Sequence, residues 1–279
     1  MPANPSVNPS ANPSPNPTSH NASILLESPG AGGVLRLTLN RPDARNALSI
    51  ALMQALIEAL GRAAKDRNTR VVVIAGAGPG FCAGHDLREL RADPRRQTYE
   101  QIFALCSELM LTIVKLPKPV IAEVHGVATA AGCQLVATCD LAIAAEEARF
   151  ATPGVNIGLF CSTPMVALSR AVGRKAAMEM LLTGELIDAA RAREIGLVNR
   201  VVPGAELGRA VNELASGIAA KSAFTVAIGK EAFYRQAELD LAAAYRYAAE
   251  VMTTNMLASD AEEGIDAFIQ KRPPVWQDR

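Results

Sequence analysis

Two short segments carry residue types that could do chemistry on a carbonyl group. One is residues 81–87 (FCAGHDL) and the other is residues 128–134 (ATAAGCQ). Each follows a predicted strand, and its small residues let a ligand approach the backbone closely. Two backbone N–H groups directed at one oxygen form an oxyanion hole, which stabilises negative charge as it develops on a carbonyl. The sequence therefore predicts a site where backbone donors bind a carbonyl oxygen.

The side chains around these segments are poorly suited to proton transfer. Gln134 ends the second segment, and its amide does not titrate in the usual pH range. His85 is the titrating candidate closest to the predicted site, although a lone histidine is more often a hydrogen-bonded structural group. Ser162 needs a neighbouring base to become a nucleophile, and no histidine lies near it in the sequence. Structural and catalytic roles stay open for His85 and Ser162.

The elements that must position these segments alternate between strand and helix, which predicts an α/β core over residues 24–203. The predicted strands cover residues 34–39, 71–75, 120–124 and 140–144, and the predicted helices cover residues 49–65, 99–115 and 130–138. Residues 204–279 form a helical region, with helices predicted at residues 205–221, 223–236, 239–256 and 261–269. We expect this region to pack on the core or on a neighbouring subunit.

Residues 1–23 repeat Asn-Pro at every fourth position. Proline removes backbone donors and disfavours helix in the residue before it, so this tail is predicted to be disordered. It contains no Lys or Arg, so it resembles neither a signal peptide nor an Arg-rich transit peptide.

Composition excludes several classes of partner. Lys+Arg and Asp+Glu both number 28, which leaves no net charge to attract nucleic acid, and no apolar run is long enough to span a bilayer. Five irregularly spaced cysteines and three unpaired histidines predict free thiols and no metal site. We therefore expect a cytoplasmic protein with no nucleic-acid or membrane partner.

Several ordered motifs carry a resemblance to a known family. They are Leu39-Asn40-Arg41-Pro42 with Arg45-Asn46-Ala47-Leu48, the segment from Phe81 to Leu87, the stretch from Pro119 to Asp140, and Ala267 to Arg272. On these the chain resembles the crotonase superfamily, the enoyl-CoA hydratase/isomerase family, from about residue 24 to residue 276. The segment from Phe150 to Pro164 is similar to one subgroup, of enoyl-CoA hydratase domain-containing proteins.

The resemblance implies a spiral of ββα units whose C-terminal helices form trimers or dimers of trimers (hexamers). It implies an acyl-CoA thioester substrate, with no cofactor beyond the CoA that the substrate carries. The backbone N–H groups of Ala83 and Ala131 would be the oxyanion donors. The implied substrate and CoA contacts are Arg45, Ala47, Leu48, Ala83, Gly84, His85, Asp86, Leu87, Phe268 and Lys271.

The chain departs from the family's hydratases at their two catalytic glutamates. Gln134 stands at the first position and Gly154 at the second, so neither can exchange protons. We therefore expect an acyl-CoA enzyme that works by oxyanion stabilisation and is a weak or atypical hydratase or isomerase. The alternatives are a malonyl-type acyl-CoA decarboxylase, an acyl-CoA thioesterase and a non-catalytic acyl-CoA binding protein. A peptidase that uses Ser162 is a poorer alternative, because no matching His and Asp are recognisable.

Overall fold

The computed structural model describes residues 23–279, so the disorder predicted for the Asn-Pro tail falls outside the described residues, Ser23 excepted. No helix among the described residues is long and apolar enough to cross a membrane.

Two sheets form the framework. In spatial order the larger sheet contains β1 (Leu25–Pro29), β2 (Val34–Leu39), β3 (Val71–Gly76), β4 (Val120–Val124), β6 (Leu141–Ala145) and β9 (Arg200–Val202). Its first pair is antiparallel and the other pairs are parallel. The smaller sheet contains β5 (Val127–Thr129), β7 (Arg149–Ala151) and β8 (Ile187–Asp188). The predicted α/β class is confirmed, and all four predicted strands form within one residue of their expected bounds.

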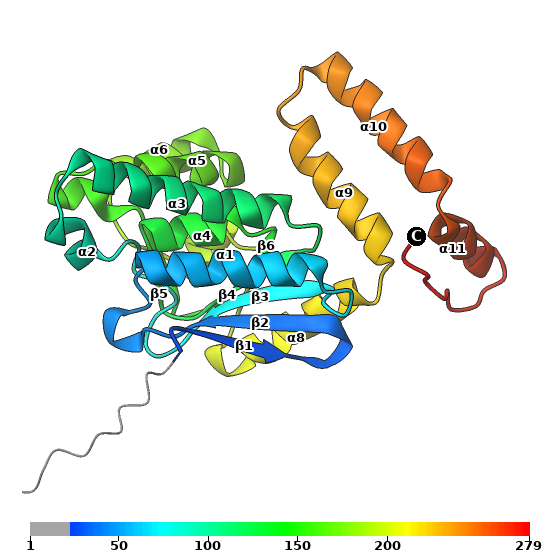
Figure 1. Ribbon diagram of the computed structural model, residues 1–279, viewed down its shortest axis with the longest axis horizontal. Helices are drawn as coiled ribbons and strands as arrows, with labels where there is room; N and C mark the ends of the chain where they lie inside the picture. The colour runs from blue at the N-terminus through cyan, green and yellow to red at the C-terminus, as the bar shows by residue number, and fades with distance from the viewer. Residues whose placement is uncertain (1–22) are drawn as a thin grey trace, which may run out of the picture.

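Helices lie on both faces of the larger sheet, with α1, α3 and α4 on one face and α8 on the other (Figure 1). The helices are α1 (Ile50–Lys65), α2 (Leu87–Ala92), α3 (Arg96–Lys115), α4 (Ala131–Thr138), α5 (Ser162–Ala171), α6 (Arg174–Thr183), α7 (Ala189–Glu194), α8 (Leu207–Ala219), α9 (Ala223–Gln236), α10 (Leu241–Met256) and α11 (Ser259–Ile269). Helix α3 begins three residues earlier than predicted. Asp93 accepts hydrogen bonds from Arg95 and from Thr98, and these hold the turn that precedes the helix.

The core is divided by the larger sheet, and β3 shows how. Val72 and Ile74 pack into the cluster under α1 and α3, whereas Val71 and Val73 pack against α8. A β-branched run is buried on both faces, as expected for a central parallel strand. Helix α8 completes this second layer and packs on the sheet, whereas helices α9 to α11 lie beyond it (Figure 1).

A partly buried polar cluster attaches α9 to the core. Lys230 Nζ donates to Asp140 Oδ2 at 2.6 Å and also to the backbone carbonyls of Ile113 and Lys118. The Tyr234 hydroxyl donates to Asp140 Oδ1 at 2.9 Å. Burial lowers the pKa of the Lys230 amine, and Asp140 opposes that shift. The ion pair therefore fixes where the C-terminal helices leave the core.

Removing the cation should show how much the fold depends on this cluster. We expect Lys230→Met to lower the free energy of unfolding by about 3 kcal/mol, because Asp140 then keeps a poorly solvated charge without its partner. Arg96→Gln is the matched control: it breaks the exposed pair with Glu100, for which we expect a loss of less than about 0.5 kcal/mol. Urea denaturation measures both, and equal losses would contradict the prediction.

Candidate oxyanion site

The N-terminus of α4 lies directly against the first predicted segment. A Cβ atom added to Gly132 would lie 2.0 Å from the carbonyl oxygen of Cys82, so only glycine fits at this contact. Ala130 precedes the helix with φ 50° and ψ −119°, and its N–H donates to the Ala151 carbonyl at 2.9 Å. A non-glycine residue at positive φ is strained. That hydrogen bond to β7 helps to hold the strained turn.

Helix α4 presents free N–H groups at this end. Its first backbone hydrogen bond runs from the Gln134 N–H to the Ala130 carbonyl. The N–H groups of Ala131, Gly132 and Cys133 therefore have no acceptor within the helix. The helix dipole adds a partial positive charge at the same place. The prediction that Ala131 supplies a free donor agrees with this geometry.

The first segment corrects the other predicted donor. The Ala83 N–H donates to the carbonyl oxygen of Arg45 at 3.0 Å, so it is not available to a ligand. Leu48 pairs with His85 as a parallel bridge, through Leu48 N–H to Gly84 O and Asp86 N–H to Leu48 O. The N–H of the bridged residue points away from its partner in such a pair. Within residues 23–279 the His85 N–H has no hydrogen-bond acceptor, and we assign the donor position to it.

Gly84 brings the two free donors together. Its φ is +98°, and a Cβ atom there would lie 2.8 Å from the Ala130 Cβ and 3.2 Å from the Ala131 nitrogen. The backbone just before His85 therefore touches the backbone of Ala131. The two unpaired N–H groups thus belong to residues at or next to this contact, one in each chain segment.

Gln134, inside α4, and Gly154, in the turn that follows β7, are both buried, but neither offers a titratable group. Gln134 Oε1 accepts a long hydrogen bond from Cys106 Sγ at 3.8 Å, and burial raises the pKa of that thiol to about 12, which keeps its proton in place. A Cβ atom on Gly154 would lie 2.7 Å from the Leu159 carbonyl oxygen and 2.9 Å from Cys161 Sγ. The packing therefore leaves no room for a carboxylate side chain at residue 154.

The His85 side chain packs edge-on against Phe103 of α3, with ring centroids 5.6 Å apart. Both ring nitrogens are buried and have no hydrogen-bond partner among the described residues. Burial lowers the pKa of the imidazole, against an opposing contribution from the Leu48 backbone, and so favours the neutral ring. It therefore carries one N–H donor and one nitrogen acceptor.

An ion pair that the sequence did not suggest holds the first segment in place. Arg41 donates to Asp86 Oδ2 at 2.8 Å and to the Ala47 carbonyl at 2.5 Å, while the buried Asn46 amide donates to the carbonyls of Ala77 and Gly80. Arg45 lies beside them with an exposed side chain and a left-handed backbone. Arg41 and Asn46 both belong to the motif quoted from the sequence, but Asp86 and Gly80, to which they donate, are distant in the sequence.

The remaining predicted residues divide between this region and the far end of the molecule. Ala47 and Leu48 are buried, and Leu87 begins α2 with its side chain exposed. The exposed Ser162 donates to the Phe160 carbonyl and has no histidine partner in the described part of the chain, so the peptidase alternative loses its support. Phe268 and Lys271 belong to α11 and its C-terminal turn, far from α2 (Figure 1). Within one chain, therefore, they are not brought to the oxyanion segments.

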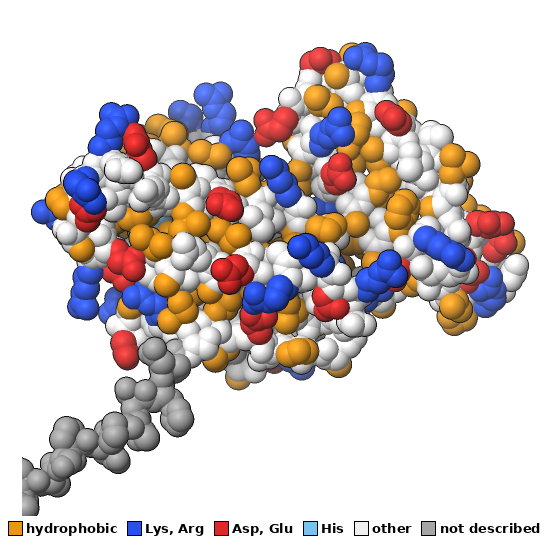
Figure 2. Space-filling model, in the orientation of Figure 1, with side chains coloured by type: hydrophobic (Ala, Val, Ile, Leu, Met, Phe, Trp, Pro, Cys, Tyr) orange, Lys and Arg blue, Asp and Glu red, His pale blue; other side chains and the backbone are white. Residues whose placement is uncertain are grey.

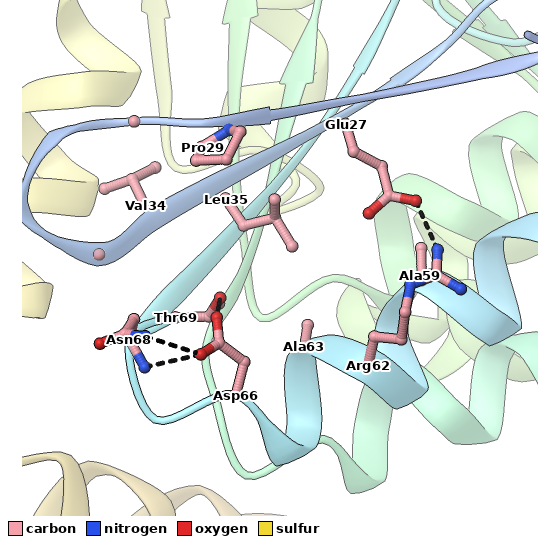
Figure 3. A pocket seen from close by; sticks show the side chains of 12 residues that line it. Glu27, Pro29, Val34, Leu35, Ala59, Arg62, Ala63, Asp66, Asn68 and Thr69 are labelled. Atoms are coloured by element: carbon pink, nitrogen blue, oxygen red, sulfur yellow. Dashed lines mark hydrogen bonds and ion pairs between the residues drawn. The ribbon is translucent and has the colours of Figure 1, made fainter.

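A surface cavity of about 370 Å³ lies elsewhere, between the β1–β2 hairpin and α1 (Figure 3). Its Glu27 is paired with Arg62, and Asp66 accepts hydrogen bonds from Asn68 and Thr69 (Figure 3). No residue of either oxyanion segment lines this cavity.

Comparison with known proteins identifies the relatives of the chain. A family model described as "Enoyl-CoA hydratase/isomerase" matches residues 30–279. Enoyl-CoA hydratase domain-containing protein 3, mitochondrial, from Xenopus laevis is 50% identical over 244 residues, 88% of this chain and 83% of that protein. The 2,3-dehydroadipyl-CoA hydratase of Escherichia coli is 37% identical over 247 residues, 88% of this chain and 96% of that protein. The predicted subgroup is thereby confirmed.

Solved structures agree with this. A Mycobacterium smegmatis enoyl-CoA hydratase superposes with a TM-score of 0.89 at 56% identity, over 91% of this chain and 99% of that one. Human enoyl-CoA hydratase domain-containing protein 3 superposes with a TM-score of 0.88 at 46% identity, over 91% of this chain and 100% of that one. The expected crotonase-type fold with C-terminal helices is confirmed. The expected cytoplasmic location is contradicted, because the relatives from Xenopus, rat, mouse and human are all named mitochondrial.

The contact at Gly132 yields a prediction about stability. We expect Gly132→Ala to lower the free energy of unfolding by about 2 kcal/mol, because the added methyl group overpacks the contact with Cys82. Gly61→Ala is the matched control, since Gly61 is inside α1 and nothing lies within 4 Å of its added Cβ. That change should raise the free energy of unfolding by about 0.5–1 kcal/mol. Chemical denaturation measures the free energy of unfolding of both variants. A Gly132→Ala protein more stable than the wild type would contradict the prediction.

Proposed function

The chain belongs to the enoyl-CoA hydratase/isomerase family, and we propose that it acts on acyl-CoA thioesters by stabilising an enolate at the thioester carbonyl. The observation that carries the proposal is the pair of adjacent N–H groups, of His85 and Ala131, with no acceptor of their own. An oxygen placed between them gains two hydrogen bonds and the field of the α4 dipole. One such donor contributes about 3–4 kcal/mol to the stability of a transition state.

Efficient hydration is not the reaction that we propose. Hydration of an enoyl thioester in this family uses two carboxyl groups, whereas Gln134 and Gly154 supply none. The tight packing at Gly154 supports this interpretation, because it leaves no space for a side chain that could carry a carboxyl group. The site suits a reaction in which an enolate forms without an enzyme base. Decarboxylation of a malonyl-type thioester meets that condition: the bond to the carboxylate breaks, carbon dioxide leaves, and the electron pair of that bond forms the enolate, which water then protonates at the α-carbon.

A panel of thioesters tests this proposal. We expect hydration of crotonyl-CoA close to background and faster loss of carbon dioxide from methylmalonyl-CoA, with products identified by mass spectrometry. Ala131→Pro removes one N–H at the first helical position and should lower turnover about 10²- to 10³-fold.

Arg174→Pro is the matched control, at the first residue of α6 after an extended N-cap residue. It should leave turnover unchanged. The oxyanion role would be refuted if turnover survived in a folded Ala131→Pro protein. Rapid hydration of crotonyl-CoA by the wild-type protein would refute the argument from the missing carboxyl groups.

We further propose that the C-terminal helices join subunits into a trimer or a dimer of trimers. Helices α9 to α11 extend past the sheet and expose large apolar side chains, among them Leu241, Leu257 and Phe268 (Figures 1 and 2). Helix α9 buries no residue of its own in the single chain. Association would cover these side chains. It would also let Phe268 and Lys271 contact CoA bound to a neighbouring subunit, although they lie far from the site of their own chain.

Light scattering after size exclusion tests this assembly. The wild-type protein should show a mass about three or six times that of one chain. We expect the double substitution Leu241→Glu with Leu257→Glu to give monomers, because both charged side chains would have to be buried on association. Lys175→Glu, on the exposed surface of α6, is the control and should not change the mass. A monomeric wild-type protein would contradict the proposal.

A further inference from the structure

Helix α11 has little packing of its own. Asp260 and Ala267 are the buried residues of the helix, whereas Phe268 and Ile269 are largely exposed. The helix lies at the far end of the molecule from α2, and the segment after it returns towards the N-terminal end of α9 (Figure 1). We call this segment, residues 273–279, the strap. Because α11 buries so little, the contacts of the strap determine how firmly the helix is held.

Asp260 binds the strap to the N-terminal end of α11. Its side chain is almost completely buried and accepts hydrogen bonds from the backbone N–H groups of Gln277 at 2.7 Å and Asp278 at 2.9 Å. Its own N–H donates to the carbonyl of Arg279 at 3.1 Å. An ionised carboxylate only accepts hydrogen bonds, and each oxygen here faces one N–H group of the strap. The end of the strap is therefore fixed to the first turn of the helix.

Glu263, one turn further along α11, binds the beginning of the strap. It accepts two hydrogen bonds from the Arg272 guanidinium, at 2.7 and 2.8 Å, and one from the Val275 N–H at 2.7 Å. Such a forked pair fixes the relative orientation of its two groups. The Trp276 ring lies against Gly264, where an added Cβ atom would be 3.1 Å from the ring. The strap and α11 are thus joined along most of their length.

The other side of the strap is bound to the core. Asp278 accepts two hydrogen bonds from the Arg70 guanidinium, at 2.7 and 3.1 Å, and one from the Ala223 N–H at the start of α9, at 2.7 Å. Trp276 Nε1 donates to the Ala220 carbonyl, between α8 and α9, at 2.9 Å. Arg70 immediately precedes β3, so the strap connects α11 to the larger sheet.

We propose that the strap positions α11 so that Phe268 and Lys271 contact CoA bound to the neighbouring subunit. Asp260 and Asp278 are the positioning residues, because they act on CoA only through the helix. The inference rests on the proposed function and its assembly, since it takes CoA on a neighbouring chain as the ligand of this helix.

The location of the two expected contacts explains why the helix needs this support. Phe268 is in the last turn of α11, and Lys271 is in the turn that joins the helix to the strap, with φ 53°. The Arg272 N–H donates to the Ala267 carbonyl at 3.0 Å and closes this turn. The path of the strap therefore sets the direction in which the Lys271 side chain leaves the backbone. Contacts that are already ordered bind a ligand more tightly, because less freedom is lost on binding.

Two substitutions release the strap and keep both residues that are expected to contact CoA. Asp260→Asn replaces one acceptor oxygen by an NH₂ group, which then faces a backbone N–H without an acceptor between them. Asp278→Asn removes the charge that pairs with Arg70. Glu213→Gln is the matched control, because it removes the charge from an exposed pair with Arg209 on α8.

Fluorescence shows whether the strap is released. Trp276 is the only tryptophan in the sequence, so the tryptophan emission reports the strap alone. We expect Asp260→Asn and Asp278→Asn to shift the emission to longer wavelength and to increase its quenching by acrylamide. Glu213→Gln should leave both unchanged. Light scattering should give all three variants the mass of the wild-type protein.

Calorimetry with free CoA then measures the positioning. We expect the affinity to fall about 3- to 10-fold in Asp260→Asn and in Asp278→Asn, because Phe268 and Lys271 must then be ordered on binding. In a protein that carries Phe268→Ala and Lys271→Met, adding Asp260→Asn should change the affinity by less than about 2-fold, since the residues through which the strap acts are gone. A purely structural role would lower the affinity in both backgrounds.

The inference is overturned if neither variant releases the strap, or if the strap is released and the affinity for CoA is unchanged. It is also overturned if Asp260→Asn still weakens binding after Phe268 and Lys271 are replaced, or if releasing the strap yields monomers. A wild-type protein that binds neither CoA nor butyryl-CoA is a different result, because it defeats the proposed function itself.

Discussion

The carbonyl of Cys82 is packed against the Cα atom of Gly132, at a distance that excludes any side chain. This contact fixes the N-terminus of α4 relative to the segment that contains His85. Oxyanion stabilisation requires donors that are already in place before charge develops, because reorganisation would consume the stabilisation. The strained turn at Ala130 and the ion pair between Arg41 and Asp86 both support the same alignment. These contacts thus position the N–H groups of His85 and Ala131, neither of which donates to an acceptor within the described residues.

That arrangement costs stability at several points. Ala130 has a backbone conformation unfavourable for an L-residue, and three buried side-chain atoms have no hydrogen-bond partner within residues 23–279. Strained and unsatisfied groups gather at functional sites because a ligand, not the fold, completes them. The polar cluster of Asp140, Lys230 and Tyr234 is the opposite case, since its side chains contact one another or backbone carbonyls. The cluster at Asp140 therefore stabilises the fold, whereas the buried atoms of His85 and Thr152 have no partner among the described residues.

The sequence predicted the main elements well, because helix and strand periodicities are local. It also predicted that residues 81–87 and 128–134 meet, because small residues follow strands at both places. It did not predict which N–H of the first segment is free. Ala83 loses its N–H to the carbonyl of Arg45, a residue 38 positions earlier with a left-handed backbone, and no local pattern reports such a bond. Short elements such as β8 and α7 were missed for a similar reason, since tertiary contacts stabilise them.

Backbone donors and side-chain acids respond differently to sequence change. The N–H groups of His85 and Ala131 persist with any residue except proline, so this pair of backbone donors survives broad variation in sequence. Proton transfer instead requires particular side chains at residues 134 and 154, and a glycine packed under the Leu159 carbonyl cannot supply one. Membership of the family therefore argues more strongly for thioester binding than for hydration. The reaction depends on what surrounds the oxyanion donors, where an amide at residue 134 and a glycine at residue 154 stand in place of two carboxyl groups.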